Sequence, residues 1–327
     1  MKKILIGAFI LVLCAVMVMG CTSTTKTIRF ADAGWDSGRF HNAVAGTIAK
    51  AAFGYSDWTE VPGTTPILHE GLIKGEVDVH MEVWTDNIES YDADLAAGKL
   101  TELGVNFDDN IQGIYVPRYV IEGDAARGIA PMAPDLKIVA DLKNYKDVFV
   151  DDEQPGKGRL YGAIPGWEVD TIMFNKYEYY GLDENFVYFR PGSQAAMDAA
   201  FTSAYDKGEA IAGYYWEPTW LLGKYDFVLL DDAPYNPDTY LAGETAFPSV
   251  KVTIGTSNAF FKGNAEFCAF LENYRTSSAL TSEALAYMQE TSASTEETAK
   301  WFLRQHDELL ASWLTPEQAD LVRKAIA

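Results

Sequence analysis

Tryptophan is the residue type in this sequence whose spacing suggests chemistry, because it recurs where predicted strands stop. A short apolar strand that begins at Ile211 runs into Tyr214, Tyr215 and Trp216, and Pro218 then ends it. Ligands of α/β proteins bind beside the carboxyl ends of strands, and a proline belongs at a rim rather than in the middle of a sheet. We therefore expect Trp216 to face a ligand, although tryptophan and tyrosine also fill cores.

Three other tryptophans occupy comparable positions, since Trp35, Trp84 and Trp167 each lie in the loop after a predicted strand. The preceding strands are predicted over residues 27–31, 77–83 and 160–164. Any one of these rings could be a packing residue, but their shared position is hard to explain by core filling alone. We expect them to converge on one site together with Trp216.

Tyrosines could complete such a site. The extended run over residues 112–121 carries Tyr115 and Tyr119 with the same strand parity, so that one face of a strand could show both. Pro117 within this run indicates an edge strand or a crossing between lobes. Tyr115, Tyr119 and Tyr215 are therefore candidate members of an aromatic box, and the choice between Tyr115 and Tyr119 stays open.

An aromatic box suits a diffuse cation. A quaternary ammonium group has no N–H to donate, whereas each ring face attracts it with roughly 0.5–2 kcal/mol. Several rings together could reach micromolar binding, about 8 kcal/mol. Asp36 and Glu82 flank two of the tryptophans and could balance the charge of a cation, or be ordinary loop acids. The predicted helix start near Ser37, a candidate cap, could instead receive a ligand carboxylate on free backbone N–H groups.

The remaining chain predicts the elements that position these rings. About 300 residues follow the amino-terminal segment, more than one core usually holds, so two lobes are expected. Strands and helices alternate in a first series, begin again near Pro134, and return through a strand to a helical carboxyl-terminal part. The return strand is predicted over residues 250–255, and helix caps are predicted at Ser193, at Ser294 with Glu297 and at Thr315 with Gln318.

The amino terminus is typical of an exported lipoprotein. Lys2 and Lys3 precede an apolar run, and the sequence VMGC over residues 18–21 matches a bacterial lipobox, which predicts cleavage before Cys21 and its lipidation. The alternative is a transmembrane helix that stays attached, for which the apolar run is short. We expect a signal peptide over residues 1–20 and a lipid-anchored tether over residues 21–26.

Charge and cysteine content exclude several classes of protein. The net charge of −21, spread along the chain, disfavours nucleic acid and anionic lipid as partners. Cys14 leaves with the leader and Cys21 is used for lipid, so Cys268 is the one thiol left in the folded part. Neither a disulfide nor a thiolate metal site is then expected, and Cys268 lies in an apolar helical segment, as an inert buried thiol would.

No catalytic or cofactor motif has a recognisable spacing. The sequence contains no nucleophile elbow, zinc-protease helix motif or phosphate loop. The four histidines are scattered, and of them His41 alone lies near a predicted ligand loop, so a metal site is not expected. Acids are too common here for their proximity to indicate acid–base catalysis. We predict neither an enzyme nor a cofactor.

The chain resembles the substrate-binding proteins of glycine betaine, proline betaine and choline ABC transporters over nearly all of its mature length. The resemblance rests on the lipoprotein start, the early strand and tryptophan loop, and three runs. These are GEVDVHMEVW at residues 75–84, ADLKNYKDVF at residues 140–149 and GYYWEPTW at residues 213–220.

The resemblance implies a type II periplasmic-binding-protein fold, that is, an α/β protein with a mixed sheet flanked by helices in each of two lobes and two crossover strands as a hinge. It implies a ligand caged by three or four aromatic rings, with Trp216, Trp84 and Trp35 as members and Trp167 as a further candidate. Some betaine binders carry a histidine shortly after the position of Trp216, where this chain has Thr219 and Trp220. Recognition of a carboxylate by that route is not expected.

We therefore predict a monomeric extracytoplasmic lipoprotein that binds a quaternary ammonium solute, such as glycine betaine or choline, and delivers it to an ABC permease. The resemblance implies that such uptake serves osmoprotection. The first lobe is predicted over residues 27–113 and 237–327, and the second over residues 114–236. Two alternatives are a receptor of the same fold for an amino acid or organic acid, and a surface-anchored hydrolase.

Overall fold

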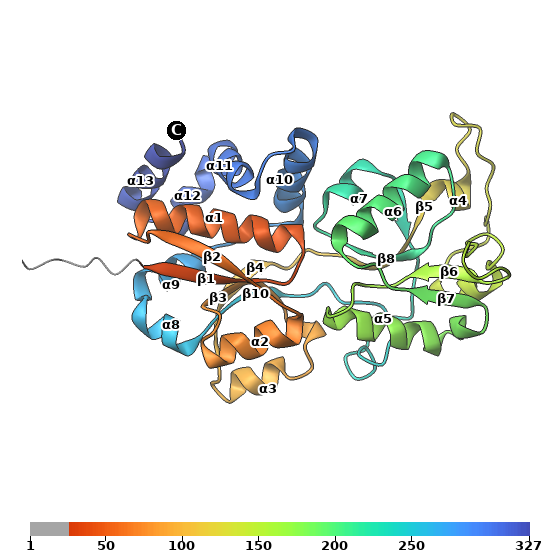
Figure 1. The fold of residues 1–327 in the computed structure, drawn as a ribbon, viewed down its shortest axis with the longest axis horizontal. Helices are drawn as coiled ribbons and strands as arrows, with labels where there is room; N and C mark the ends of the chain where they lie inside the picture. Colours follow the sequence, from red (N-terminus) through yellow and green to blue (C-terminus); the bar gives the residue numbers. More distant parts are fainter. Residues whose placement is uncertain (1–25) are drawn as a thin grey trace, which may run out of the picture.

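Two five-stranded sheets, each with its own helices, lie side by side along the long axis of the molecule in the computed structural model (Figure 1). The structure describes residues 26–327. The predicted signal peptide, Cys21 and the tether up to residue 25 lie outside the described residues. Within residues 26–327, none of the helices combines the length and the hydropathy needed to cross a bilayer.

The first sheet has the strand order β2-β1-β3-β10-β4 and is mixed. β1 pairs in parallel with β2 and β3, whereas β10 pairs antiparallel with β3 and β4. The strands are β1 (Thr27–Asp32), β2 (Asp57–Pro62), β3 (Val79–Trp84), β4 (Thr101–Phe107) and β10 (Val252–Thr256). The predicted return of the chain to the first lobe near residue 250 is thus confirmed.

Helices cover both faces of the first sheet. α1 lies over one face beneath the carboxyl-terminal helices, and α2 and α3 lie on the other (Figure 1). The helices of this lobe are α1 (Asp36–Ala52), α2 (Thr65–Lys74), the short 3-10 helix η1 (Thr85–Asn87), α3 (Tyr91–Ala96), α8 (Asn258–Gly263), α9 (Ala265–Asn273), α10 (Ser278–Thr291), α11 (Thr295–Gln305), α12 (Asp307–Trp313) and α13 (Pro316–Ile326). The capping boxes predicted at Ser294 and Thr315 are both formed.

The second sheet, of order β7-β6-β8-β5-β9, is mixed as well. β6 pairs in parallel with β7 and β8, and β5 pairs antiparallel with β8 and β9. Its strands are β5 (Gln112–Pro117), β6 (Gly158–Tyr161), β7 (Phe186–Phe189), β8 (Gly213–Trp216) and β9 (Phe227–Leu229). β5 lies inside the sheet and not at its edge, and Pro117 is tolerated because it is the last residue of the strand.

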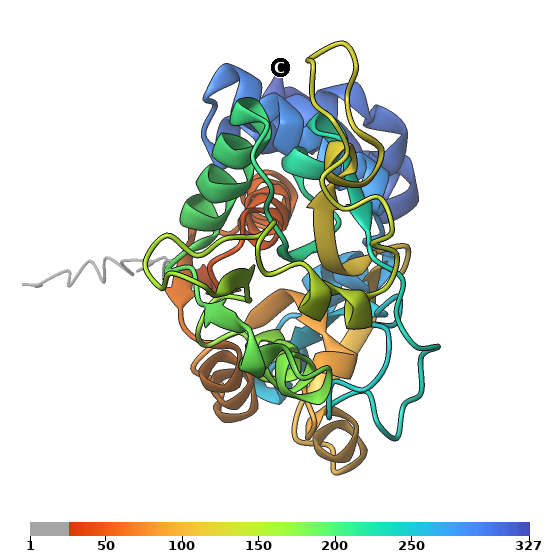
Figure 2. The same cartoon turned by 90° about the vertical axis from the view of Figure 1, so that its right-hand side faces the viewer.

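Helices also cover both faces of the second sheet. Figures 1 and 2 show α5 on one side and α6 on the other. The helices are α4 (Arg118–Glu122), the 3-10 helix η2 (Val139–Asn144), α5 (Glu168–Tyr179), the 3-10 helix η3 (Leu182–Glu184), α6 (Gln194–Lys207) and α7 (Trp220–Lys224). As predicted, Ser193 caps α6 by accepting a hydrogen bond from the backbone N–H of Ala196.

The chain crosses between the sheets twice, through residues 108–111 and through residues 230–251. The predicted boundary between residues 113 and 114 falls inside β5, all of which pairs within the second sheet. At the crossing, the side-chain amide of Asn110 donates to the backbone oxygen of Val250 and accepts from its N–H. The two crossing segments are therefore tied to each other at this buried pair.

A buried lysine holds most of the longer crossing segment against the second lobe. Lys176 on α5 donates through Nζ to the carboxylate of Asp232 at 2.5 Å and to the backbone oxygens of Gly243 and Thr245 at 3.2 and 2.7 Å. Burial lowers the pKa of Lys176, and Asp232 opposes that shift. Because the ammonium group is buried and all three partners lie on this segment, the clamp fixes it to α5.

Candidate functional site

A cavity lies between the two lobes at the carboxyl ends of β1, β3 and β8. It encloses about 460 Å³ of empty space, counting the part open to solvent. Its lining comes from both lobes and is mainly aromatic and apolar: Trp35, Thr65, His80, Glu82, Val83, Trp84, Asn87, Ile88, Trp167, Glu168, Val169, Tyr214 and Trp216. Concave, largely apolar sites with a few polar groups are typical of small-molecule binding.

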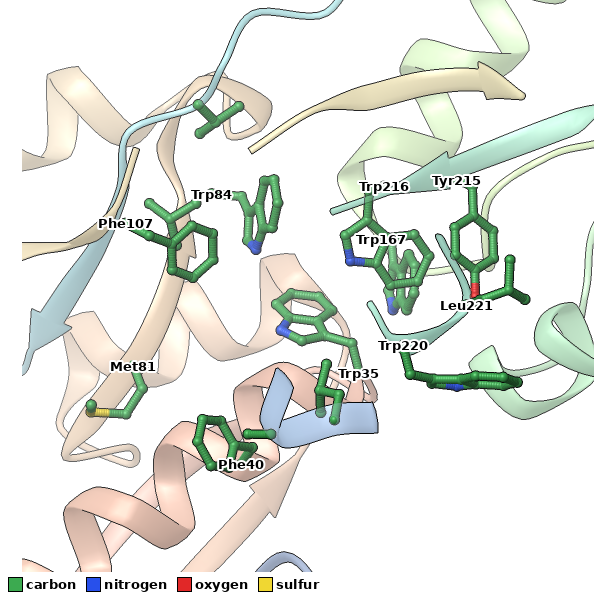
Figure 3. Packing of buried hydrophobic residues seen from close by; sticks show 14 of the residues in the cluster. Trp35, Phe40, Met81, Trp84, Phe107, Trp167, Tyr215, Trp216, Trp220 and Leu221 are labelled. Carbon is green, nitrogen blue, oxygen red and sulfur yellow. The ribbon is translucent and has the colours of Figure 1, made fainter. Parts of the chain in front are cut away.

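The four loop tryptophans meet in this cavity. Trp35 and Trp167 lie edge to face with ring centroids 5.4 Å apart, and Trp167 and Trp216 do the same at 5.0 Å. Trp84 faces these three rings across open space and rests on Phe107 behind it (Figure 3). Since Trp35 and Trp84 belong to the first lobe and Trp167 and Trp216 to the second, the aromatic enclosure exists only where the lobes meet.

The local fold explains why these rings converge. Trp35, Trp84 and Trp167 are the residues immediately before α1, η1 and α5, so each stands at a turn from strand or loop into helix. Trp216 is the last residue of β8, before the Glu217–Pro218 peptide, which is cis. A ring at such a turn points along the sheet edge into the space between the lobes.

Glu82 lies behind the aromatic wall and connects two of its rings. Its Oε2 accepts hydrogen bonds from the indole N–H of Trp35 at 2.7 Å, from the hydroxyl of Ser37 at 3.0 Å and, at a longer 3.5 Å, from the indole N–H of Trp84. The prediction that Ser37 caps a helix is wrong, because its hydroxyl donates to Glu82 instead. One carboxylate thus sets the orientation of the rings on the first lobe.

The electrostatics of Glu82 are unusual because the side chain is fully buried. Burial raises its pKa to about 7, although the hydrogen bonds from Ser37, Trp35 and Trp84 oppose the shift. Its other oxygen, Oε1, lies 3.4 Å from Nε2 of His41 and has no hydrogen-bond partner. Burial lowers the pKa of His41 to about 3, so at neutral pH this imidazole is neutral. Ionised Glu82 therefore has no cation beside it among the described residues.

Some predicted site residues do not reach the cavity. Tyr119 lies on α4 rather than on the strand, so the parity argument does not apply, and its hydroxyl donates to the backbone of Ala204 and Glu209. Tyr115 is buried within β5 and is not part of the cavity lining. Tyr215 points to the other face of β8, where its hydroxyl donates to Asp198.

Asp36 and His41 also do not line the cavity, for different reasons. Asp36 follows Trp35 at the start of α1, pairs with Arg39 at 3.8 Å and is not part of the cavity lining. His41 is buried behind Glu82 and hydrogen-bonds the hydroxyl of Tyr274 at 2.8 Å. Neither side chain is placed to touch a ligand in the cavity.

The lining contains residues that the sequence interpretation did not select. Tyr214 stacks on Trp216 at 5.8 Å, and strand parity would have found it, since residues 214 and 216 of one strand share a face. His80 lies two residues before Glu82 on β3 and shares its face for the same reason. Thr65 and Asn87 begin α2 and end η1, and no sequence pattern marked them.

The described residues offer little else for chemistry. Within residues 26–327, no group of three or more His, Cys, Asp or Glu side chains could hold a metal ion. Cys268 is buried, and burial raises the pKa of its thiol to about 11, so the reactive thiolate is scarce at neutral pH.

The fold and the position of the cavity define a class: a two-lobed solute-binding protein whose ligand site lies between the lobes. A family model described as the substrate-binding domain of ABC-type glycine betaine transport systems matches residues 26–305. The chain belongs to this family, whose members bind solutes for transport and do not act as enzymes. No curated protein sequence matches the chain.

Solved structures share the fold at low sequence identity. The glycine betaine/L-proline-binding protein of Borrelia burgdorferi is 20% identical with a TM-score of 0.71, over 91% of this chain and 100% of that one. An ABC-transporter choline-binding protein in complex with choline is 19% identical with a TM-score of 0.70, over 92% and 98%. Lactococcal OpuAC, closed on glycine betaine, is 19% identical with a TM-score of 0.68, over 89% and 100%.

Proposed function

We propose that the cavity binds a quaternary ammonium solute, with its methylated nitrogen held among Trp35, Trp84, Trp167 and Trp216. The observation that carries this proposal is the convergence of four indole rings from two lobes on one cavity. A methylated ammonium group offers no donor for hydrogen bonding, so ring faces and a nearby negative charge are the groups that can hold it. Two solved relatives, one in complex with choline and one with glycine betaine, agree with this chemistry.

We further propose that a cation without its own carboxylate, such as choline, binds more tightly than glycine betaine. None of the described residues that line the cavity is Lys or Arg, whereas Glu82 and Glu168 are both there. Burial raises the pKa of Glu168, so this carboxyl too is poorly solvated. A ligand carboxylate would add a third acid to a low-dielectric site, at a cost that a hydroxyl group does not incur.

Titration calorimetry with the full chain tests both proposals. At pH 8 we expect choline to bind with a micromolar or lower Kd, glycine betaine to bind at least about tenfold more weakly, and glutamate not to bind. Recovery of the bound compound unchanged, by NMR, is expected for a receptor. Tight binding of glutamate with no response to choline would favour a receptor for amino acids instead.

We also propose that the protein is anchored outside the cell membrane through a lipid on Cys21 and passes its ligand to an ABC permease. The family model and the lipobox over residues 18–21 support this location and this partner. Replacement of Cys21 by serine is expected to abolish incorporation of labelled fatty acid and to release the protein from the membrane fraction. Unchanged fractionation of Cys21→Ser would contradict the anchor.

A further inference from the structure

Beside the aromatic enclosure, the two lobes touch along a seam that has its own hydrogen bonds. The indole N–H of Trp167 donates to the backbone oxygen of Ala33 at 2.9 Å, and the backbone N–H of Thr65 donates to the backbone oxygen of Gly166 at 3.0 Å. Gly166 has φ +94°, and a side chain there would approach Thr64 of the opposite lobe to 2.6 Å. The bond between Thr65 and Gly166 therefore joins the two backbones directly, and Thr64 packs so closely against Gly166 that it leaves no room for a side chain there.

A third bond of the seam is made by the side chain of Gln194. Gln194, the first residue of α6 in the second lobe, accepts through Oε1 a hydrogen bond of 2.9 Å from the backbone N–H of Asp36, the first residue of α1 in the first lobe. Gln194 is buried despite its place at a helix start. Trp35, the residue before α1, makes no side-chain cap of its own, so the amide of Gln194 replaces the missing cap.

Gln194 is also connected to the interior of its own lobe. Its amide opposes the rise in the pKa of the carboxyl group of Asp198, which lies one turn further along α6. Asp198 in turn accepts hydrogen bonds from the hydroxyl of Tyr215 and from the indole N–H of Trp220. Tyr215 is the residue before Trp216 on β8. The amide of Gln194 that caps α1 therefore lies near a hydrogen-bonded pair, Asp198 and Tyr215, of which Tyr215 belongs to the strand carrying Trp216.

We propose that Gln194 is a closure residue, which caps α1 from the opposite lobe when the lobes are together and thereby sets how long a bound solute is retained. As to the solute, this inference rests on the proposed function. When the lobes separate, water can satisfy the N–H of Asp36, so the bond favours closure only by the small net value of a neutral hydrogen bond. The bond shifts the equilibrium between the open and closed states and so slows ligand release, and it does not touch the ligand itself.

Gln194→Met tests the proposal, because methionine keeps the length of the side chain and removes its hydrogen-bonding groups. Stopped-flow tryptophan fluorescence with choline is expected to show a dissociation rate raised about 2- to 10-fold and an association rate within about twofold of the wild type. Ser193→Ala is the matched control, since it removes the cap of α6 at the neighbouring position without breaking a bond between lobes. It should lower the melting temperature and leave the dissociation rate unchanged.

Amide hydrogen exchange of the ligand-free full chain gives a second measurement that does not depend on any ligand. In Gln194→Met, exchange should become faster at Asp36 and also at Thr65, whose N–H bonds Gly166 elsewhere on the seam. Faster exchange at Asp36 alone would make Gln194 a local cap and overturn the proposal. An unchanged dissociation rate, or an equal rise in Ser193→Ala, would overturn it as well.

The two measurements separate this proposal from the proposed function. If the wild-type chain binds no quaternary ammonium compound, the proposed function fails, whereas the exchange rates at Asp36 and Thr65 still decide whether Gln194 holds the lobes together.

Discussion

Trp216→Ala is expected to weaken the binding of choline by at least about 30-fold, which corresponds to about 2 kcal/mol. Trp216 lies edge to face with Trp167 and stacks on Tyr214, so its removal takes away one ring face and loosens two neighbours. The same change removes a buried side chain and should lower the free energy of unfolding by about 3–5 kcal/mol. Calorimetry and urea denaturation measure the two effects separately.

Two further variants show whether the loss of affinity comes from the cavity. Trp216→Phe keeps a smaller ring and should lose about 3- to 10-fold in affinity, because tryptophan attracts a cation better than phenylalanine does. Trp301→Ala removes a tryptophan that stacks on Tyr287 at 4.1 Å in the carboxyl-terminal helices, away from the cavity, and should bind choline as the wild type does. Equal affinities of wild type and a folded Trp216→Ala would contradict the aromatic site.

Glu82→Gln is expected to weaken the binding of choline about tenfold at pH 8 and to remove most of its dependence on pH. In the wild type, the ionised carboxylate attracts the ligand cation, so affinity should rise as pH increases through about 7, the pKa to which burial raises Glu82. Glutamine can still accept from Trp35 and can donate to the neutral His41, so the rings keep their orientation. Calorimetry from pH 5.5 to 8.5 checks the profile.

Ionisation of Glu82 should strengthen binding but weaken stability as pH rises. Because the pKa of Glu82 is raised in the folded state, its contribution to stability is fully present below its ordinary value of 4.5 and is lost as pH rises through about 7. The loss is up to about 3 kcal/mol, at 1.36 kcal/mol for each pKa unit. Ligand-free Glu82→Gln should therefore be more stable than the wild type at pH 8 in urea denaturation, even though it binds less tightly.

Other groups near the cavity could shift the pH profile, and they can be told apart. Burial lowers the pKa of His80 to about 4 and raises that of Asp198 to about 6. His80 does not titrate in the range of the assay, whereas Asp198 does, from the far side of the aromatic wall. An affinity of Glu82→Gln that still rises steeply between pH 5.5 and 8.5 would assign the dependence to another acid, Asp198 or the cavity-lining Glu168, and contradict the role of Glu82.

The sequence predicted the fold and the main rings of the candidate site because both follow from local rules. A tryptophan directly after a strand and before a helix is visible in sequence, and the topology of an α/β lobe brings such positions to one edge. Tyr119 lies away from the cavity because the strand ends at Pro117 and a helical turn begins at Arg118, which breaks the alternation on which its pairing with Tyr115 was based. Tyr115 stays in the strand, but it pairs with Gly213, three residues before Trp216 at the end of β8, and this register is not visible in the sequence.

The parts that could not be predicted depend on contacts between distant segments. Glu82 was selected as a flanking acid, but nothing in the sequence shows that Trp35, 47 residues away, donates its indole N–H to it. Gln194 carried no signal at all, because a glutamine at a helix start is ordinary on the surface and becomes significant only where another lobe covers it. Such contacts are set by tertiary packing, which local patterns do not record.

The lysine clamp described for α5 limits the directions in which the molecule can bend. Lys176 fixes the longer crossing segment to the second lobe as far as Thr245, and Asn110 couples the two crossings at Val250. We therefore expect the relative motion of the lobes to be concentrated in the backbone near Asn110 and Val250, with the two crossing segments bending together. If the lobes close by one such motion, the tryptophans of the two lobes meet in the same arrangement each time, so the shape of the closed cavity does not vary from one closure to the next.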